Sequence, residues 1–242
     1  MPQTYAIPYV GHSGCAEDVQ SFRFERPKDY AFRPGQFFQL TLQTREGEQA
    51  KFFSHADAPA DAVVELTTRL SGSAFKDALL ALEVGARVGF RGPMGSLAVP
   101  PEASSVGFLT GGVGITPAHS IIRATQRQDS PLPMALFYGS RTPACIPYAD
   151  EFRRYASEGR RFTYVEVVET PDADWDGPVG FLTADIIREH THPNDVGHWI
   201  VSGPPAMVVA MRRLVDELQL PPGRVSYEQF AGYDPDEHPL GE

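Results

Sequence analysis

The sequence predicts a two-domain protein of the β plus α/β class, in which a six-stranded antiparallel β-barrel precedes a domain with a parallel, Rossmann-like sheet. Residues 5–91 contain short apolar runs separated by turn residues, which is typical of an antiparallel barrel or sandwich. From residue 106 onward, strand-like runs alternate with helical patterns, which indicates a parallel sheet covered by helices. The 242-residue chain is long enough for each domain to bury its own core.

The link between the domains is expected in the proline-containing segment 99–104. This places the barrel at 1–101 and the α/β domain at 102–233, and the acidic, proline-rich segment 234–242 is expected to be a mobile tail. Barrel strands are predicted at 5–10, 19–24, 36–42, 51–54, 63–69 and 87–91, parallel strands at 106–109, 135–138, 163–168 and 198–201, and helices at 74–82, 117–127, 148–157, 183–188 and 204–218.

A glycine-rich turn follows the first of these parallel strands. Gly111, Gly112 and Gly114 let the backbone approach an anionic ligand closely, and the next helix offers unpaired amides at its N-terminus. Thr116 is the expected N-cap, and Pro117 suits the first helical turn. The spacing is similar to the dinucleotide fingerprint, but proline replaces the third glycine, which argues against an ordinary Rossmann dehydrogenase. A tight turn without a ligand is the alternative interpretation.

Composition and charge exclude several classes of function. The formal net charge of −10 makes nucleic acid a poor partner. The chain has no apolar run long enough to span a membrane and no signal-peptide pattern at its N-terminus, so a cytoplasmic protein is expected. Cys15 and Cys145 are too few for a four-thiolate iron–sulfur cluster and are not spaced as zinc ligands, so no metal site is expected. Redox chemistry in this chain therefore needs an organic cofactor or a partner.

The order of a barrel, a parallel sheet and a glycine-rich turn resembles the ferredoxin-NADP reductase superfamily of flavoproteins. The resemblance extends from Tyr5 to Tyr233. It implies that the barrel binds FAD, or less often FMN, and that the second domain binds NADPH or NADH at the carboxyl ends of its strands.

The family's Arg-x-Tyr-Ser motif stands here as Lys51-Phe52-Phe53-Ser54. By resemblance, Lys51 holds a flavin phosphate with less directional contacts than arginine, Phe53 stacks on the flavin ring, and the Ser54 hydroxyl lies near flavin N5. His55 stands where the family has an aliphatic residue, and a structural role is favoured over a contact with the flavin. The flavin-binding residues implied in this way are Lys51, Phe52, Phe53, Ser54, His55, Ala56, Gly72, Ser73 and Phe230.

The second domain carries the motifs for the nucleotide. Ser140 and Arg141 follow the second parallel strand with no acidic residue beside them, which favours NADPH over NADH. The family's Cys-Gly-Pro motif stands as Ser202-Gly203-Pro204, so a hydroxyl replaces the thiol that lies beside the nicotinamide. By resemblance, the nucleotide-binding residues are Gly111, Gly112, Gly114, Thr116, Pro117, Ser140, Arg141, Gly203 and Pro204.

Three residues are expected to act directly in catalysis, namely Ser54, Ser202 and Glu228. The C-terminal segment 226–233 resembles the segment that precedes the ferredoxin domain of multidomain reductases, and here Glu228 and Phe230 either border the flavin or are residues of a last strand.

The resemblance implies a flavin-dependent oxidoreductase that takes hydride from NAD(P)H onto FAD and passes electrons to a separate acceptor, a ferredoxin. The acceptor is expected to be another molecule because the sequence contains no iron–sulfur or haem module. Two alternatives stay open: an NAD(P)H-dependent reductase of free flavin or ferric complexes, and a non-catalytic flavin-binding relay or regulatory subunit. The departures at Lys51, Phe53 and Ser202 support the latter.

Overall fold

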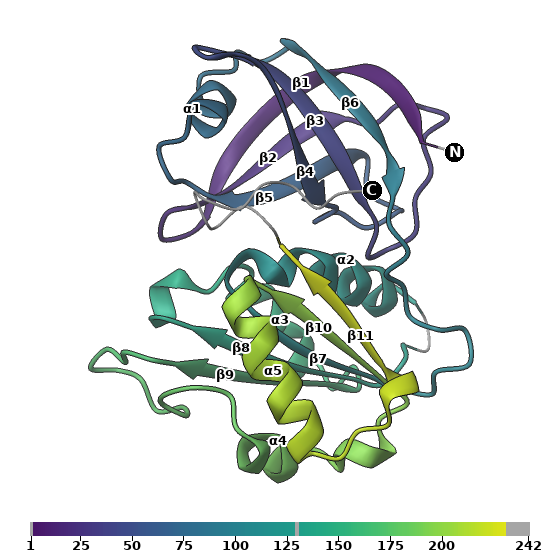
Figure 1. Ribbon diagram of the computed structural model, residues 1–242, viewed down its shortest axis with the longest axis vertical. Coiled ribbons are helices and arrows are strands. Elements are labelled where there is room, and N and C mark those ends of the chain that lie inside the picture. The colour runs from purple at the N-terminus through teal and green to yellow at the C-terminus, as the bar shows by residue number, and fades with distance from the viewer. Residues whose placement is uncertain (1, 129–130, 231–242) are drawn as a thin grey trace.

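The two expected domains are present in a computed structural model that describes residues 2–128 and 131–230. The segment 234–242, expected to be a mobile tail, lies outside the described residues. A six-stranded antiparallel sheet has the strand order β4-β3-β6-β1-β2-β5 and curls into a barrel, and a five-stranded parallel sheet has the order β11-β10-β7-β8-β9 (Figure 1). The strands are β1 (Gln3–Ala16), β2 (Val19–Glu25), β3 (Phe37–Thr44), β4 (Gly47–Ser54), β5 (Val63–Arg69), β6 (Arg87–Met94), β7 (Val106–Gly111), β8 (Met134–Ser140), β9 (Phe162–Val168), β10 (His198–Gly203) and β11 (Val225–Gln229).

The barrel closes around an aromatic core because its strands alternate between inward and outward side chains. In β3, Phe38, Leu40 and Leu42 are buried, whereas the residues between them are partly exposed. The same core contains Phe22, Phe24 and Phe90 from β2 and β6. One α-helix of the barrel, α1 (Ala74–Leu80), begins at Ser73, whose side chain accepts a hydrogen bond from the Lys76 amide.

The parallel sheet is buried on both faces, which explains why its strands are continuous apolar runs. All six residues of β7, the central strand, are buried. One face packs against α4 (Ala184–His190) and α5 (Pro205–Glu217), and the other against α2 (Ile115–Gln126) and α3 (Ala149–Ser157). Within the described part of the chain, none of the helices has the length and apolarity needed to cross a membrane.

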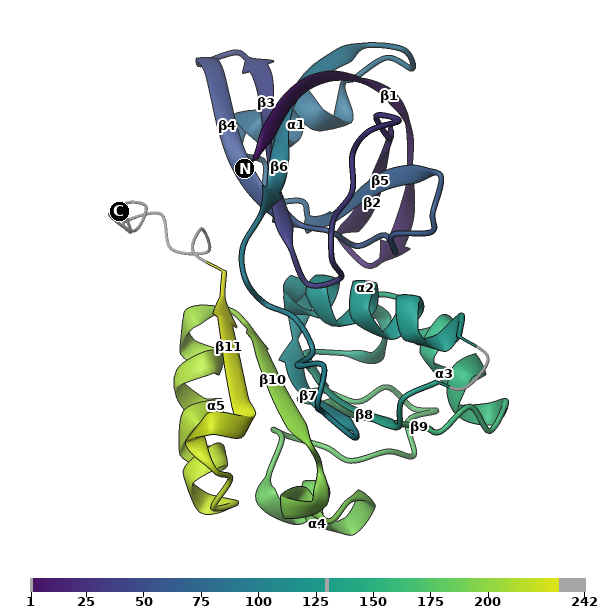
Figure 2. The ribbon, with the colours of Figure 1, turned by 90° about the vertical axis from the view of Figure 1, so that its right-hand side faces the viewer.

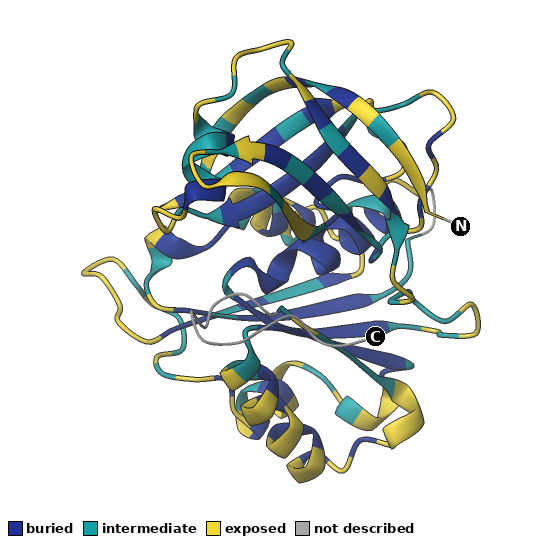
Figure 3. Ribbon diagram, turned by 45° about the horizontal axis from the view of Figure 1, so that its top comes forward, coloured by how far each residue is buried: buried dark blue, intermediate teal, exposed yellow. Residues whose placement is uncertain are grey.

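Helix α2 lies between the barrel and the parallel sheet (Figures 1 and 2). It is buried along nearly its whole length, with ten of its twelve residues buried, and Figure 3 shows it in dark blue between the two domains. The polar side chains of a helix in this position need hydrogen-bond partners in both domains. The contacts between the domains that are described below come mostly from these side chains.

The structure confirms the predicted fold class and corrects some of its details. β1 is longer than expected, and β11 adds a fifth strand at the edge of the parallel sheet. The N-cap assignment of Thr116 is wrong. A 3-10 turn at Gly112–Gly114 leads directly into α2, so the helix begins two residues earlier than expected, at Ile115, and the Thr116 hydroxyl donates to the Val113 carbonyl instead of capping.

Because β7 packs beside β10, we expect that no side chain fits at Gly107. A Cβ atom there would lie 2.4 Å from the buried ring of Trp199. We expect Gly107→Ala to lower the free energy of unfolding by about 1–3 kcal/mol through overpacking, as measured by urea denaturation. Gly139→Ala in β8 is the matched control, because a Cβ there meets nothing closer than 4.0 Å. Equal stability of the two variants would contradict this account.

Candidate functional site

The two domains meet at a hydrogen bond between their strand ends. Ser54 is the last residue of β4, and its Oγ donates to Oε1 of Glu228 in β11 over 3.0 Å. Ser54 is buried, and the register of the parallel sheet pairs Glu228 with Ser202 and Ser202 with Thr110. The three residues expected to be catalytic are therefore brought together at the carboxyl edge of the parallel sheet, where open α/β sheets bind ligands.

Glu228 is held in its protonated form up to near-neutral pH. Burial raises the pKa of its carboxyl from 4.5 to about 7, and the hydrogen bond from Ser54 opposes part of this shift. A glutamic acid with such a pKa can hold or release a proton in the neutral range, which is the property required of a general acid or base.

Ser202 faces the glycine-rich turn. It is fully buried and its Oγ donates to the Gly114 carbonyl at 2.8 Å. A Cβ on Gly114 would lie 2.5 Å from Gly203 Cα and 2.6 Å from the Ser202 carbonyl oxygen, so only glycine allows this approach. The turn is thus held against the start of α5, where Pro204 precedes the first helical residue.

The remainder of the turn is positioned by the neighbouring strand. Gly112 has a φ of +55°, with open space where a Cβ would be, and its carbonyl accepts a hydrogen bond from the Tyr138 hydroxyl of β8 at 2.9 Å. Thr116 and Pro117 are buried in the first turn of α2. A Cβ on Gly111 would lie 2.5 Å from the Met207 sulfur, so glycine at this position lets Met207 pack against the turn.

Thr110 is a polar residue that the sequence did not single out. Its hydroxyl is buried at the end of β7, beside Ser202, and has no hydrogen-bond partner among the described residues. A buried hydroxyl without a partner is unfavourable in a completed structure. Because it lies at the carboxyl edge of the sheet, this orphaned group fits a site completed by a polar ligand such as a nucleotide.

Three cations gather where β4 and β5 approach the start of α1. Lys51 and Arg69 are close enough that their charges, together with burial as the larger cause, lower the pKa of Lys76. The Lys76 ammonium also donates to Ser71 Oγ at 3.1 Å, beside Gly72 and Ser73. Mutually repelling cations are stabilised by an anion, so this cluster fits the phosphates of FAD.

The two phenylalanines of the flavin motif point to opposite sides of β4. Lys51 and Phe53 lie opposite Leu40 and Phe38 of the core, and the Phe53 ring lies 5.8 Å from that of Phe75 in α1. Phe52 lies on the other face of β4 and is 57% exposed, in edge-to-face contact with Phe37 at 5.8 Å. The alternation of a strand places one aromatic ring against the core and leaves the other at the surface.

His55 is part of a buried network. Its Nε2 contacts the Tyr30 hydroxyl and its Nδ1 contacts Asp57 Oδ1, each at 2.8 Å, and its ring stacks on Phe32 at 3.6 Å. Burial lowers the pKa of His55 although the Asp57 carboxylate opposes this shift. Both ring nitrogens therefore have partners within the barrel.

The residues expected to hold the outer parts of the nucleotide lie at the same edge of the sheet. Ser140 ends β8 and its hydroxyl donates to the Thr142 carbonyl at 3.1 Å. Arg141 is exposed and its guanidinium approaches Cys145 Sγ at 3.8 Å. Phe230, which was expected to border the flavin, follows β11, and its backbone N–H donates to the Gly203 carbonyl at 3.1 Å.

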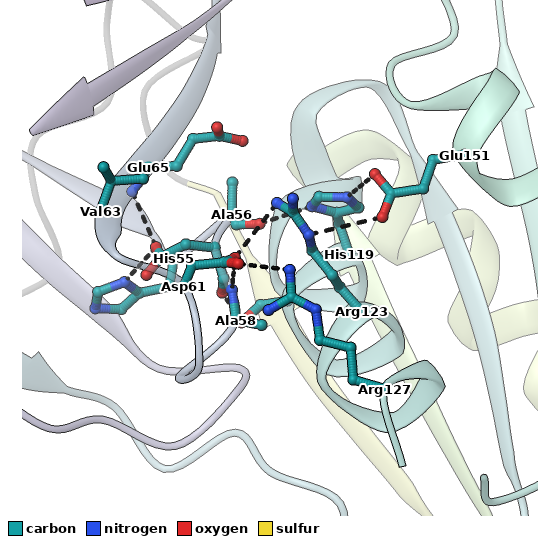
Figure 4. Close-up of polar contacts among 12 residues, drawn as sticks. His55, Ala56, Ala58, Asp61, Val63, Glu65, His119, Arg123, Arg127 and Glu151 are labelled. Atoms are coloured by element: carbon teal, nitrogen blue, oxygen red, sulfur yellow. Dashed lines mark hydrogen bonds and ion pairs between the residues drawn. The ribbon is translucent and has the colours of Figure 1, made fainter. Parts of the chain in front are cut away.

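A second set of polar contacts joins α2 to the segment that follows Ser54 (Figure 4). His119 Nδ1 donates to the Ala56 carbonyl at 2.7 Å, and Ser120 Oγ donates to the Asp57 carbonyl at 2.6 Å. Asp61 binds Arg123 at 3.4 Å and Arg127 at 2.5 Å. None of these α2 residues was singled out from the sequence, since a polar residue inside a helix pattern carries no sign of what it will contact.

Fold and site together define a flavoprotein reductase with separate flavin and nucleotide domains. The family model described as oxidoreductase NAD-binding domain matches residues 108–213. The chain is 27% identical over 222 residues to NADH-cytochrome b5 reductase 1 of Neosartorya fischeri, covering 86% of this chain and 71% of the relative. It is 29% identical over 223 residues to ferredoxin–NADP reductase B of Sorangium cellulosum, covering 88% of this chain and 91% of the relative.

A solved structure shows the same likeness. The cytochrome P450 reductase GcoB of Amycolatopsis superposes with a TM-score of 0.82 and 26% sequence identity, covering 95% of this chain and 70% of that protein. The chain belongs to the ferredoxin-NADP reductase superfamily. It is an NAD(P)H-dependent flavoprotein reductase with FAD as its cofactor.

The raised pKa of Glu228 gives a testable dependence of stability on pH. A carboxyl whose pKa is raised by folding stabilises the protein fully below pH 4.5, and this contribution is lost as the pH rises through about 7. We expect the difference in thermal midpoint between the wild type and Glu228→Gln to change in this window, with the wild type losing stability relative to the variant. Ser54→Ala should move the change to higher pH, because it removes the hydrogen bond that lowers the pKa. Parallel pH profiles of the wild type and Glu228→Gln would contradict the assignment.

Proposed function

We propose that this protein takes hydride from NADPH onto FAD held between Ser54 and the carboxyl edge of the parallel sheet, and passes the electrons to a separate ferredoxin. The observation that carries this proposal is the Ser54–Glu228 hydrogen bond, which joins the barrel to the nucleotide domain at the strand ends. When bound, the flavin accepts a hydride and releases electrons singly. The division into domains at 1–101 and 102–233 is part of the proposal.

Each group at this site has a task in the proposed reaction. Lys51 and Ser73 bind the flavin phosphates, assisted by the neighbouring cations. Phe53 supports the flavin ring from the barrel. The Ser54 oxygen, which uses its own proton to bind Glu228, keeps lone pairs that can accept a hydrogen bond from the flavin. The raised pKa of Glu228 lets its carboxyl gain or lose a proton near neutral pH, directly beside the Ser54 hydroxyl that it contacts.

The nucleotide side is proposed to work by alignment. The amides of the turn 111–114 bind the pyrophosphate, and Gly203, which Pro204 follows, lies directly against this turn. Ser202 holds the turn in place through its bond to Gly114. Ser140 and the exposed Arg141 bind the 2′-phosphate of NADPH, since arginine forms directional bonds with phosphate.

The proposal of a ferredoxin as the acceptor is based on the surface beside Ser54. Phe52 is exposed there, and the strand register places Gln39 beside it and the exposed Arg91 beyond Gln39. Aromatic residues are enriched in protein interfaces, and a nearby cation attracts an acidic partner. The name of the Sorangium relative includes ferredoxin, which supports a ferredoxin as the acceptor.

The first test is an anaerobic absorbance titration of the FAD-bound protein with NADPH and with NADH. We expect either nucleotide to bleach the flavin and NADPH to do so at lower concentration. Arg141→Ala should raise the concentration of NADPH needed more than that of NADH, because only NADPH carries the 2′-phosphate. A flavin that neither nucleotide bleaches would contradict the proposal and favour a non-catalytic subunit.

A second test separates the acceptor from the chemistry. We expect Phe52→Ser to lower kcat/KM for a ferredoxin by about tenfold, in keeping with the loss of an aromatic contact at an interface. The same variant should reduce ferricyanide at the wild-type rate, because a small acceptor does not need the docking surface. Val84→Ser, at an exposed apolar residue in the barrel, is the control. If Phe52→Ser reduced ferredoxin with the wild-type kcat/KM, this part of the proposal would be contradicted. Turnover of free flavin faster than of ferredoxin would contradict it as well.

A further inference from the structure

His119 lies at the point where three parts of the molecule meet. Its side chain is fully buried in α2. Nδ1 points to the carbonyl of Ala56, two residues after Ser54, at 2.7 Å, and Nε2 points to Oε2 of Glu151 in α3 at 3.1 Å (Figure 4). One imidazole therefore connects the end of the flavin strand to both helices that cover this face of the parallel sheet.

The two partners of this imidazole can only accept hydrogen bonds. A backbone carbonyl has no proton to donate. Burial alone would raise the pKa of Glu151, but His119, Tyr155 and Arg123 together lower it to about 2, so this carboxyl is ionised. A neutral imidazole has a single N–H and would leave one of these acceptors facing a lone pair. Both acceptors are satisfied only if each ring nitrogen of His119 carries an N–H.

The surroundings of His119 suit a cation. The ring of Tyr148 stacks on it at 3.7 Å with an angle of 5° between the planes. An aromatic face stabilises a cation placed above it. The Tyr148 hydroxyl also contacts Thr67 in β5, so the stacked pair touches the barrel a second time. Arg123 lies between Glu151 at 3.7 Å and Asp61 at 3.4 Å, and Arg127 binds Asp61 at 2.5 Å, so each of these two carboxylates also has an arginine as a partner.

We propose that His119 is a positioning residue for hydride transfer: as a buried imidazolium, it holds the segment 54–57 against α2 and so sets where the Ser54 hydroxyl lies relative to the nucleotide. This inference rests on the proposed function of Ser54. It predicts that His119 affects the rate of the chemical step without touching either cofactor. A neutral side chain at this position leaves the Ala56 carbonyl or the Glu151 carboxylate without its donor, and the segment carrying Ser54 shifts.

The protonation of His119 is tested by NMR of FAD-bound protein labelled with ¹⁵N in its histidine rings. At neutral pH we expect both ring nitrogens of His119 to be protonated, with the signal identified by its absence from His119→Phe. In Glu151→Gln the charge of the partner is lost, and the ring should become neutral with its proton on Nδ1. An unprotonated ring nitrogen of His119 in the wild type would overturn the inference.

The positioning role is tested by the rate at which NADPH reduces the bound FAD under anaerobic conditions. His119→Phe keeps the stacking on Tyr148 and loses both N–H groups, and we expect its limiting rate to fall by about tenfold to a hundredfold. The NADPH concentration at half-saturation should stay within about twofold, since the residue does not contact the nucleotide. His119→Gln keeps an N–H donor and should lose only about three- to tenfold. His190→Gln is the control, because His190 is exposed in α4.

The outcomes separate this inference from the proposed function. Wild-type protein that binds FAD but is not reduced by either nucleotide would contradict both. Reduction of the wild type together with an unchanged limiting rate in His119→Phe would contradict the positioning role alone. If His119→Phe does not retain FAD, the limiting rate of His119→Gln is measured instead. A wild-type limiting rate in His119→Gln would overturn the inference.

Discussion

The structure depends on the contact between α2 and the segment that follows β4. This contact is polar and buried, and it involves backbone carbonyls as well as charged side chains. A buried polar group without a partner is strongly unfavourable. Apolar surfaces can slide over one another, but paired donors and acceptors fit in one arrangement only. The relative position of barrel and sheet is therefore specified by the directions of a few hydrogen bonds.

The geometry of the proposed site follows from this contact. Ser54 belongs to the barrel and Glu228 to the last strand of the other domain, and the two are 174 residues apart in sequence. Their hydrogen bond forms only when β4 and β11 end at the same place. The polar residues of α2 hold the chain directly after Ser54, so the helix that covers the sheet also aligns the serine with the carboxyl edge where the nucleotide is proposed to bind. The same burial that fixes this geometry raises the pKa of Glu228 toward neutrality.

The departures from the family motifs are accommodated by local chemistry. Ser202 replaces a cysteine, and its hydroxyl makes a 2.8 Å bond to Gly114 that a thiol, a weak donor, would make poorly. Lys51 replaces an arginine, and Arg69 and Lys76 stand beside it as further cations. His55 replaces an aliphatic residue, and Tyr30 and Asp57 satisfy both of its nitrogens. These substitutions agree with a working reductase, the class to which the chain belongs.

The sequence by itself determined the fold class, the order of the elements and the residues that lie at the strand ends. Alternation, apolar runs and glycine-rich turns are local patterns, and local backbone preferences follow from them. It did not determine the start of α2 at Ile115, because the packing of Gly114 against Gly203 overrides the capping preference of Thr116. Only the tertiary structure decided that Ser54 bonds to Glu228, that Thr110 is buried without a partner, and that His119 lies between Ala56 and Glu151. These features join or bury residues far apart in the chain, and hydrogen-bond partners and burial are properties of the folded packing that no local pattern encodes.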